Sequence, residues 1–295
     1  MGETERVSGL VLKNYSGFYY VQTADTTIYE CKLRGKIKDQ IVTGDRVFIT
    51  PLLNGAGVLE NLEKRDNLLY RPKIANVDLL LIVMAYNQPV PSLSLLDRLI
   101  MLANYNHLNP IIILNKSDLK AHENTELILN YYPQAGFKVI SVSAFKQLNL
   151  NLIDREIKDK IAVMAGPSGA GKSSLLNALS AKVDIKTQTV SSKIGRGRHT
   201  TRHVELYPLE TGGWLADTPG FGVLDMPVMK SIELSGYFPD FKPYFPSCRF
   251  GNCLHNQETE CGVKQAVNDG NILSNRYRNY LQMLQEVIQK ERCYK

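Results

Sequence analysis

The sequence predicts a chain of three parts: an all-β N-terminal domain, a central α/β domain with a parallel sheet, and a small cysteine-rich domain with helices. Three observations lead to this fold class. Short runs of alternating apolar and polar residues fill the first ~65 positions. From about residue 67, strand-like and helix-like patterns alternate. Beyond Leu224 this periodicity ends, and three cysteines lie between positions 248 and 261. We expect domains at 1–66, 67–224 and 225–295.

The composition is that of a globular protein rather than a membrane or disordered one. Of the 295 residues, 44% are hydrophobic and 22% charged, and the net charge is +6. The most apolar run, Val77–Tyr86, is too short to span a bilayer. The first residues are charged and lack the apolar core of a signal peptide. We therefore expect a cytoplasmic protein, a monomer without a membrane partner. Its mildly basic charge favours an acidic partner such as nucleic acid.

The N-terminal part contains five strand-like runs separated by Gly, Asn and Asp. They are SGLVLKNY (8–15), GFYYVQT (17–23), TTIYECKL (26–33), DRVFITPL (45–52) and GVLENLEK (57–64). Five short strands in such a length are typical of a small barrel of the OB type. Two interpretations stay open on the strands alone: an oligonucleotide-binding barrel, or a β-domain without a ligand.

The central part alternates strands and helices in the manner of a doubly wound sheet. Apolar runs predict strands at 76–86, 110–115, 138–144 and 161–166, and amphipathic patterns predict helices at 93–106, 123–132, 150–161 and 172–179. The runs 204–210 and 213–220 are expected to form a strand pair. In the C-terminal part, the pattern predicts one helix at 275–290.

The stretch GPSGAGKSS matches the phosphate-binding pattern G-x-x-x-x-G-K-S and lies between a predicted strand and a predicted helix. That context favours a phosphate loop over a chance glycine-rich turn. Glycines let backbone N–H groups surround phosphate oxygens, the lysine supplies a positive charge, and the first serine can bind Mg²⁺. The candidate residues are Gly166, Pro167, Ser168, Gly169, Ala170, Gly171, Lys172, Ser173 and Ser174.

A second candidate motif, DTPG, ends another apolar strand. Asp217 would hold Mg²⁺ through a water, and the Gly220 N–H would contact a γ-phosphate. Standing alone, this motif would be better interpreted as a surface turn. Its position after a strand that follows the phosphate loop favours the nucleotide role.

A third motif selects the base. In NKSD, Asn115, Lys116, Ser117 and Asp118 follow an apolar strand. A carboxylate such as Asp118 can accept hydrogen bonds from N1–H and the 2-amino group of guanine, a donor pair that adenine lacks. Ser143 and Ala144, in SVSA, resemble the short loop whose backbone contacts the guanine oxygen. Three motifs at three strand ends indicate GTP and exclude a generic ATPase or kinase.

The order of these motifs is inverted, because NKSD precedes the phosphate loop. Ligands bind at the carboxyl ends of parallel strands whatever the chain order of those strands. The inversion therefore predicts a circularly permuted P-loop GTPase. As a consequence, the segment after DTPG runs directly into the C-terminal domain.

The cysteine cluster has the form Cys248-x4-Cys253-x-His255-x5-Cys261. Three thiolates and one imidazole suit tetrahedral Zn²⁺, and four protein ligands leave no open position. We expect one structural zinc ion, rather than buried free cysteines or a zinc-dependent hydrolase. Cys31 and Cys293 are isolated and are interpreted as ordinary thiols.

The segment SSKIGRGRHTTRH lies between the phosphate loop and DTPG, where a first switch segment belongs. Such a basic run is either a solvated loop or one that orders on GTP and contacts RNA phosphates. Either Thr200 or Thr201 would reach Mg²⁺. Phe221 stands where ordinary switch GTPases place a Gln that orients the attacking water. His199 is the nearest candidate to replace that Gln, the alternative being a surface histidine without a role.

These residues together resemble the ribosome small-subunit-dependent GTPase A (RsgA) family. The resemblance covers essentially the whole chain and rests on NKSD before GPSGAGKSS before DTPGF, on GRGRHTTR, on RPKIANVD at Arg71 and on the cysteine cluster. It implies a GTPase that binds the small ribosomal subunit and its rRNA and acts late in that subunit's maturation. It also implies a histidine in the role given above to His199.

Two hypotheses follow. The first is a GTP hydrolase, slow alone and stimulated by the small subunit, whose release from the subunit is timed by hydrolysis. The second is an RNA-binding scaffold whose GTP site senses nucleotide state with little catalysis. Phe221 keeps the second open, whereas Lys172, Ser173 and Asp217 favour the first.

Overall fold

The structure of the protein, a computed structural model, describes residues 6–35, 39–70, 72–180, 204–210, 212–217 and 225–293. The chain forms two compact units. The first comprises Met1–Leu79, Leu150–Met164 and Ser173–Phe221. The second comprises Leu80–Asn149, Ala165–Lys172 and Gly222–Lys295.

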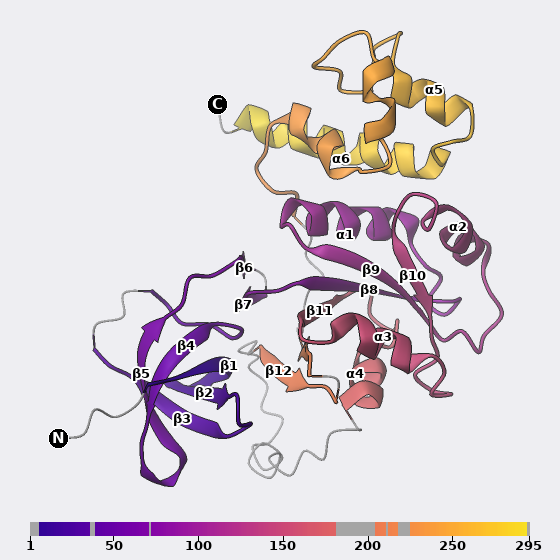
Figure 1. Ribbon diagram of the computed structural model, residues 1–295. Helices are drawn as coiled ribbons and strands as arrows, with labels where there is room; N and C mark the ends of the chain where they lie inside the picture. The colour runs from indigo at the N-terminus through magenta and orange to yellow at the C-terminus, as the bar shows by residue number, and fades with distance from the viewer. Residues whose placement is uncertain are drawn as a thin grey trace. The chain divides into compact units, whose positions relative to one another are not determined.

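The first unit begins with a closed five-stranded barrel in the order β1-β2-β3-β5-β4 (Figure 1). Its strands are β1 (Val7–Tyr15), β2 (Phe18–Thr23), β3 (Ile28–Leu33), β4 (Arg46–Pro51) and β5 (Ala56–Leu62). The β3–β5 pair is parallel and the other pairs are antiparallel. Apolar side chains at alternate positions fill the interior, among them Val47 and Ile49 of β4. The predicted OB-type barrel is confirmed.

A short hairpin follows the barrel and was not predicted from the sequence. It pairs β6 (Leu68–Tyr70) with β7 (Lys73–Ala75). Three-residue strands are too short to show a periodicity. The barrel approaches this hairpin closely at Gly44, whose φ is +86°. A Cβ there would lie 2.2 Å from the carbonyl oxygen of Ala75, so only glycine fits.

The remaining elements of the first unit belong to the α/β part. They are α3 (Leu150–Ile157), β11 (Ile161–Ala165), α4 (Lys172–Ser180), β12 (Glu205–Pro208) and β13 (Trp214–Asp217). β13 pairs parallel with β11 and antiparallel with β12, as the predicted strand pair requires. The helix predicted for 150–161 ends at Ile157, because Asp159 adopts a φ of +57° and the chain turns into β11.

In the second unit, three strands have the order β10-β9-β8. They are β8 (Leu79–Ala85), β9 (Asn109–Asn115) and β10 (Lys138–Ser141), and β9 and β10 are parallel. The helices that accompany them are α1 (Leu93–Tyr105) and α2 (Glu123–Tyr131). Every residue of β8 is buried, which explains why its sequence is a continuous apolar run. The Ser92 hydroxyl caps α1 by accepting a hydrogen bond from the Leu95 N–H.

The C-terminal part of the second unit is helical. It contains two 3-10 segments, η3 (Ser231–Tyr237) and η4 (Lys242–Ser247), and two helices, α5 (Gly262–Asn268) and α6 (Ser274–Cys293). A further 3-10 segment, η1 (Leu53–Gly55), lies between the barrel strands β4 and β5. Phe238, Phe241 and Tyr280 form a triangle of aromatic contacts with centroids 5.0–5.2 Å apart. The sequence predicted α6 but not α5, η3 or η4.

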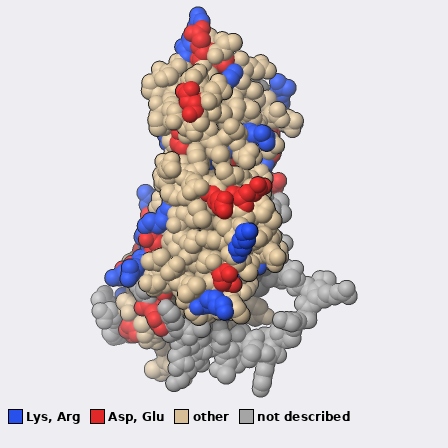
Figure 2. Space-filling view, turned by 90° about the vertical axis from the view of Figure 1, so that its right-hand side faces the viewer, with Lys and Arg blue, Asp and Glu red and all other residues tan. Residues whose placement is uncertain are grey.

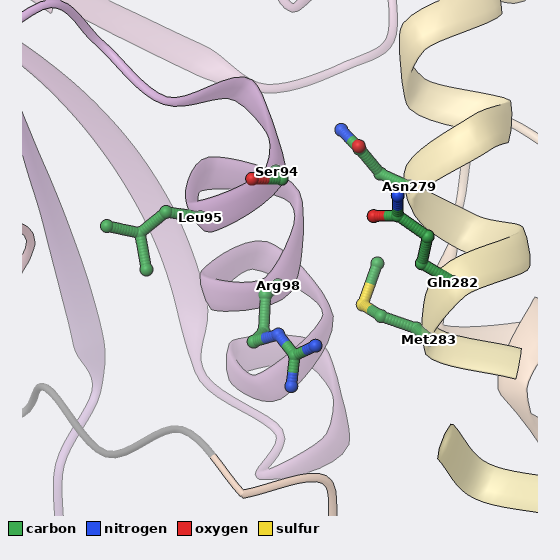
Figure 3. Close-up of a pocket in the computed structure, with 6 residues that line it drawn as sticks. All are labelled: Ser94, Leu95, Arg98, Asn279, Gln282 and Met283. Atoms are coloured by element: carbon green, nitrogen blue, oxygen red, sulfur yellow. The ribbon is translucent and has the colours of Figure 1, made fainter. Parts of the chain in front are cut away.

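Helix α6 lies along α1 (Figure 1). Met101 of α1 belongs to the same buried cluster as Leu284 and Val287 of α6. Toward the beginning of α1, the two helices border a pocket of about 240 Å³, drawn in Figure 3. Its lining residues are Ser94, Leu95, Arg98, Asn279, Gln282 and Met283. The C-terminal part is therefore packed onto a helix of the α/β part, in addition to being joined to it through the chain.

Among the described residues, no helix combines the length and apolar character needed to cross a bilayer. On the face drawn in Figure 2, uncharged residues cover most of the described surface, and acidic and basic side chains lie interspersed.

Candidate nucleotide-binding site and metal cluster

The glycine-rich loop between β11 and α4 adopts a conformation that side chains would prevent. Gly166 has a φ of +141°, and a Cβ there would lie 2.1 Å from the carbonyl oxygen of Val83. Gly171 has a φ of +92°, and its Cβ would lie 2.3 Å from the amide nitrogen of Asn115. Both glycines are therefore required by close packing against neighbouring strand ends. Pro167, Ser168, Gly169 and Ala170 complete the loop.

Lys172 is placed across this loop. Its ammonium donates hydrogen bonds to the carbonyl oxygens of Gly166 and Pro167, both at 2.8 Å. Partial burial lowers the pKa of Lys172. A bound phosphate would supply the negative charge that these two neutral carbonyls do not. Ser173 and Ser174 follow in the first turn of α4 and are exposed.

Asn115, at the end of β9, connects the predicted base-binding motif to the phosphate loop. Its side-chain nitrogen donates to the Ala170 carbonyl at 3.0 Å and to the Gly171 carbonyl at 3.4 Å. Its side-chain oxygen accepts from the backbone N–H groups of Lys116 at 2.8 Å and Ala144 at 3.1 Å. The side chain is 2% exposed. One amide therefore joins three segments that are far apart in the sequence.

Asp118 lies exposed beside the loop that follows β10. The Ser143 hydroxyl donates to the Asp118 carboxylate, and the Ser117 N–H donates to the Val142 carbonyl at 3.0 Å. These bonds hold the NKSD segment against Ser143 and Ala144, as expected if the two segments share a ligand. The carboxylate remains exposed to solvent and can accept from a guanine edge.

Lys116 makes a contact that the sequence did not suggest. Its backbone has a φ of +63°, and its ammonium donates to the Gln88 carbonyl at 2.5 Å. The segment after β8 therefore borders the site, and Pro89 lies 3.5 Å from the position of a Cβ on Gly169. The signal available in the sequence was weak: Gln88 and Pro89 follow a predicted buried strand, whose carboxyl end belongs at the same sheet edge.

Several predicted site residues lie outside the described part of the chain. These are His199, Thr200, Thr201, Gly220 and Phe221, together with Arg71 of the RPKIANVD stretch. The backbone of Asp217 ends β13, but its side chain is not described. Their predicted roles therefore rest on the sequence.

The second cluster is formed by the three cysteines and the histidine of the C-terminal part. The donor atoms of Cys248, Cys253, His255 and Cys261 all lie within 4.8 Å of one another. The His255 Nδ1 is 3.3 Å from the Cys261 Sγ and 3.6 Å from the Cys248 Sγ, and these two sulfurs are 4.0 Å apart. Ligands of tetrahedral zinc stand roughly 3.3–4 Å apart, given Zn–S and Zn–N bonds of about 2.3 and 2.1 Å. The cluster can hold a metal ion.

Aromatic residues fix the shape of this cluster. The Phe245 ring stacks on the His255 ring with centroids 5.1 Å apart and planes 13° apart. The hydroxyls of Tyr277 and Tyr280 donate to the carbonyls of His255 and Leu254, at 2.7 and 2.8 Å. These contacts come from η4 and α6, so the ligand loop is held by the surrounding helices. Sequence reasoning missed them, although Tyr277 and Tyr280 lie one turn apart in the predicted C-terminal helix.

Burial shifts the acidity of the cluster. It raises the pKa of the Cys253 thiol to about 12 and also raises that of Cys261. Burial lowers the pKa of His255. Without a metal, the cluster therefore favours protonated thiols and a neutral imidazole. A divalent cation would reverse the preference of the thiols, because it stabilises thiolates directly.

The family comparison covers most of the chain. A family model described as RsgA GTPase matches residues 62–227. A second, described as RsgA N-terminal domain, matches residues 8–59. The first match includes the phosphate loop, NKSD and DTPG, and the second includes nearly all of the barrel.

Curated relatives match over almost their whole length. The small ribosomal subunit biogenesis GTPase RsgA of Carboxydothermus hydrogenoformans is 46% identical over 290 residues, which cover 97% of this chain and 99% of that protein. The protein of the same name from Moorella thermoacetica is 42% identical over 291 residues, covering 98% of this chain and all of that protein.

Two solved structures share the fold. YjeQ from Thermotoga maritima superposes with a TM-score of 0.82 at 35% identity, covering 96% of this chain and 99% of that one. YloQ, described as a circularly permuted GTPase, gives a TM-score of 0.81 at 35% identity, with 98% of each chain covered. The inverted motif order thus has a counterpart in a structure of known permutation.

Proposed function

The chain belongs to the RsgA family of GTPases, and from this premise we propose that it hydrolyses GTP on the small ribosomal subunit during late maturation of that subunit. The observation that carries the proposal is the bonding of Asn115, which connects the phosphate loop to the predicted base-binding segments. A site that couples a guanine-reading carboxylate to a phosphate loop is suited to GTP.

In the proposed site, the nucleotide phosphates bind the loop from Gly166 to Ser174, and Lys172 contacts the β- and γ-phosphates. The residues that would hold Mg²⁺ with the nucleotide are Ser173, through its hydroxyl, and Asp217, and the ion would supply positive charge to the phosphates. Thr200 or Thr201 would offer a further hydroxyl to Mg²⁺, and the Gly220 N–H would contact the γ-phosphate. At the base, Asp118 accepts from N1–H and the 2-amino group of guanine.

Hydrolysis needs a group that positions the attacking water. Phe221 cannot do so, because its side chain has no hydrogen-bonding atom. We assign that role to His199, whose imidazole can accept a proton or a hydrogen bond near neutral pH. The proposed enzyme is slow alone and is stimulated when the small subunit arranges the segment that carries His199.

One zinc ion is proposed in the C-terminal cluster, with a structural role. Cys248, Cys253, His255 and Cys261 supply four ligands, so no position remains for a substrate. Zinc binding would add to the ring stacking and tyrosine hydrogen bonds that hold this loop, and would contribute to its folding.

The barrel offers a face suited to single-stranded rRNA. Lys13 Nζ lies 5.2 Å from the ring centroid of Tyr20, and Lys32 Nζ lies 4.9 Å from that of Phe18. Tyr20 and Phe18 are two residues apart on β2 and therefore point to the same face. Aromatic rings that stack bases, beside cations that contact phosphates, are typical of such surfaces. This supports an RNA-binding barrel at 1–66. We further propose a GTPase domain at 67–224 and a zinc-binding domain at 225–295.

The decisive experiment is GTP turnover with and without isolated ribosomal subunits, together with co-sedimentation under GDP and a non-hydrolysable GTP analogue. Stimulation by the small subunit, and not by the large one, supports the proposal. Binding without turnover would favour the alternative of an RNA-binding scaffold that senses nucleotide state. We also propose that this GTPase acts in the cytoplasm and is a monomer. Sedimentation of the free protein tests the monomer.

A further inference from the structure

Phe145 is an exposed aromatic residue at the tip of a well-braced loop. It exposes 80% of its surface in the turn that follows β10. Ser143 and Leu148 close this turn through two backbone hydrogen bonds of 3.2 and 3.0 Å. Inside it, the Lys146 N–H donates to the Ser143 hydroxyl at 3.0 Å, and the Gln147 amide donates to the Ala144 carbonyl at 2.8 Å. These hydrogen bonds hold the backbone of the turn in the conformation that exposes Phe145.

The same turn is hydrogen-bonded to Asn115 and Asp118, the first and last residues of the NKSD motif. The Ser143 hydroxyl donates to the Asp118 carboxylate, and the Ala144 N–H donates to the Asn115 side-chain oxygen at 3.1 Å. Phe145 is the next residue in the chain. Its ring is thus attached to the segment that would lie against the edge of a guanine base.

Asp118 can satisfy only the hydrogen-bonding edge of the base. The two faces of a purine are large π surfaces, and they gain free energy when an aromatic or apolar side chain covers them. Leu119, directly after Asp118, is 37% exposed and supplies a second apolar surface at this end of the site. The Lys146 ammonium lies 5.1 Å from the centroid of the Phe145 ring, so the ring already carries a cation near it.

We propose that Phe145 covers one face of the guanine base and so contributes to nucleotide affinity independently of the edge recognition by Asp118. The inference rests on the proposed function, since it takes guanine nucleotide as the ligand. In this proposal Phe145 binds the base and does not contribute to phosphate binding by the loop. Because stacking does not read the edge of a base, the ring contributes equally to guanine and to xanthine binding.

The test is the dissociation constant of GDP and of inorganic triphosphate, measured by calorimetry on the full-length protein. Phe145→Ala should weaken GDP binding about 5- to 150-fold, since one base–aromatic stack contributes about 1–3 kcal/mol. Triphosphate, which lacks a base, should bind unchanged. Phe145→Tyr keeps the ring and should bind GDP like the parent.

Phe250→Ala is the matched control. Phe250 is also an exposed aromatic with a cation near its ring, that of Arg249 at 5.5 Å, but it belongs to the C-terminal part. This variant should bind GDP like the parent. GDP affinity of Phe145→Ala within twofold of the parent would overturn the inference, as would an equal loss for GDP and triphosphate. A parent protein that binds no GDP would instead defeat the proposed function itself.

A second measurement does not depend on the loss of a side chain. Phe145→Trp adds an indole at the proposed stacking position, and the chain contains one other tryptophan, Trp214. GDP should quench the added fluorescence, because stacking on guanine brings the two rings into contact. Triphosphate should leave it unchanged, as should GDP added to Phe250→Trp. Equal spectra for Phe145→Trp with and without saturating GDP would contradict the proposed contact.

Discussion

Arg276 of α6 and Asp97 of α1 form an ion pair in which both side chains are completely buried, with Nη1 2.6 Å from Oδ1. Arg276 also binds Asp240 through two nitrogens, at 2.6 and 2.7 Å. Asp97 accepts further hydrogen bonds from Tyr132 and Asn279, each at 2.6 Å. Burial alone would lower the pKa of Arg276, but the charges of Asp97 and Asp240 raise it well above its ordinary value. Burial raises the pKa of Asp97, and the charge of Arg276 opposes that shift. Arg276 is therefore a charged group at the centre of a polar network closed to solvent.

This network changes how the C-terminal part is expected to respond to nucleotide. The inverted motif order suggested one connection to the nucleotide site, through the chain segment after DTPG. The structure adds a second, because α1 precedes β9, the strand that delivers Asn115. The C-terminal part is thus packed onto the base-reading side of the site through buried polar contacts. Any nucleotide-driven reorientation of that part must either preserve this network or break it.

Removing Arg276 should strongly destabilise the packing of α6 on α1. Arg276→Met leaves Asp97 and Asp240 without their counter-charge, and breaking a buried pair in this way costs about 3–5 kcal/mol. Urea unfolding followed by circular dichroism measures the loss. Arg98→Met, which removes the more exposed contact with Glu286, is the control and should cost less than about 1 kcal/mol. A similar small cost for Arg276→Met would show that the network contributes little.

The barrel, the parallel strands and the motif-bearing loops could be predicted because each has a local signature. Alternation marked the barrel strands, and β8 was a continuous apolar run. The buried network had no such signature. Arg276 and Arg278 stand two residues apart in α6, and only Arg276 is buried. Helical spacing did contain a hint, since Arg276 precedes Tyr280, Leu284 and Val287 on the buried side of the helix.

Other elements escaped prediction because their contacts are distant in the chain. Helix α5 spans only Gly262–Asn268 and is stabilised by packing against η4, not by a regular apolar period. The contact of Lys116 with Gln88 joins two strand ends through a side chain and a carbonyl. Such contacts depend on tertiary arrangement, which a single sequence does not display.

Base selection by Asp118 can be tested by changing its hydrogen-bonding character. Asp118→Asn replaces a carboxylate by an amide that keeps one acceptor oxygen but presents an NH2 donor, so both guanine contacts lose the charge of their acceptor, and the NH2 favours the 2-oxo group of xanthine over the 2-amino group of guanine. Two hydrogen bonds to a charged group contribute about 1.5–3 kcal/mol each, so GDP should bind about 100-fold or more weakly. Calorimetry with GDP and xanthosine diphosphate measures the shift. Unchanged GDP affinity would refute the assignment.

His199 is predicted to act in hydrolysis and not in binding. His199→Ala should keep GDP affinity but lower the subunit-stimulated single-turnover rate about 100-fold or more, the effect typical of a positioned catalytic side chain. His203→Ala, in the same segment of the sequence, is the control and should retain the rate. If both variants hydrolyse GTP like the parent, the water is positioned by another group, on this chain or on the ribosome.

Metal binding at the cysteine cluster should become tighter as pH rises. Burial raises the pKa of Cys253 and Cys261, so the metal-free thiols hold their protons at neutral pH, whereas His255 is already neutral because burial lowers its pKa. Zinc must displace the thiol protons, and a higher pH makes that easier. Chelator competition between pH 6 and pH 8 measures the trend. Cys253→Ser should weaken zinc binding, and Cys293→Ser, outside the cluster, should not. An affinity independent of pH would contradict this account.

Two barrel side chains contact the chain where β12 begins. The Thr43 hydroxyl donates to the buried carbonyl of Val204 at 2.9 Å, and Lys13 pairs with Glu205 at 2.7 Å. Both contacts hold the chain just after the segment that carries His199. Lys13 also lies over Tyr20, on the face proposed to bind RNA.

RNA bound to the barrel would contact Lys13, which also pairs with Glu205 at the start of β12. Loosening the attachment of the barrel to this part of the chain should therefore weaken the stimulation of GTP hydrolysis by the subunit. Thr43→Val leaves the Val204 carbonyl without its partner, at a cost of about 1–3 kcal/mol. The subunit-stimulated rate should fall severalfold, while GDP affinity and the rate without subunits stay unchanged. Thr27→Val, in the exposed turn before β3 where the Thr27 hydroxyl donates to Asp25 at 3.0 Å, should behave like the parent. Full stimulation of Thr43→Val would show that the barrel contact does not influence hydrolysis.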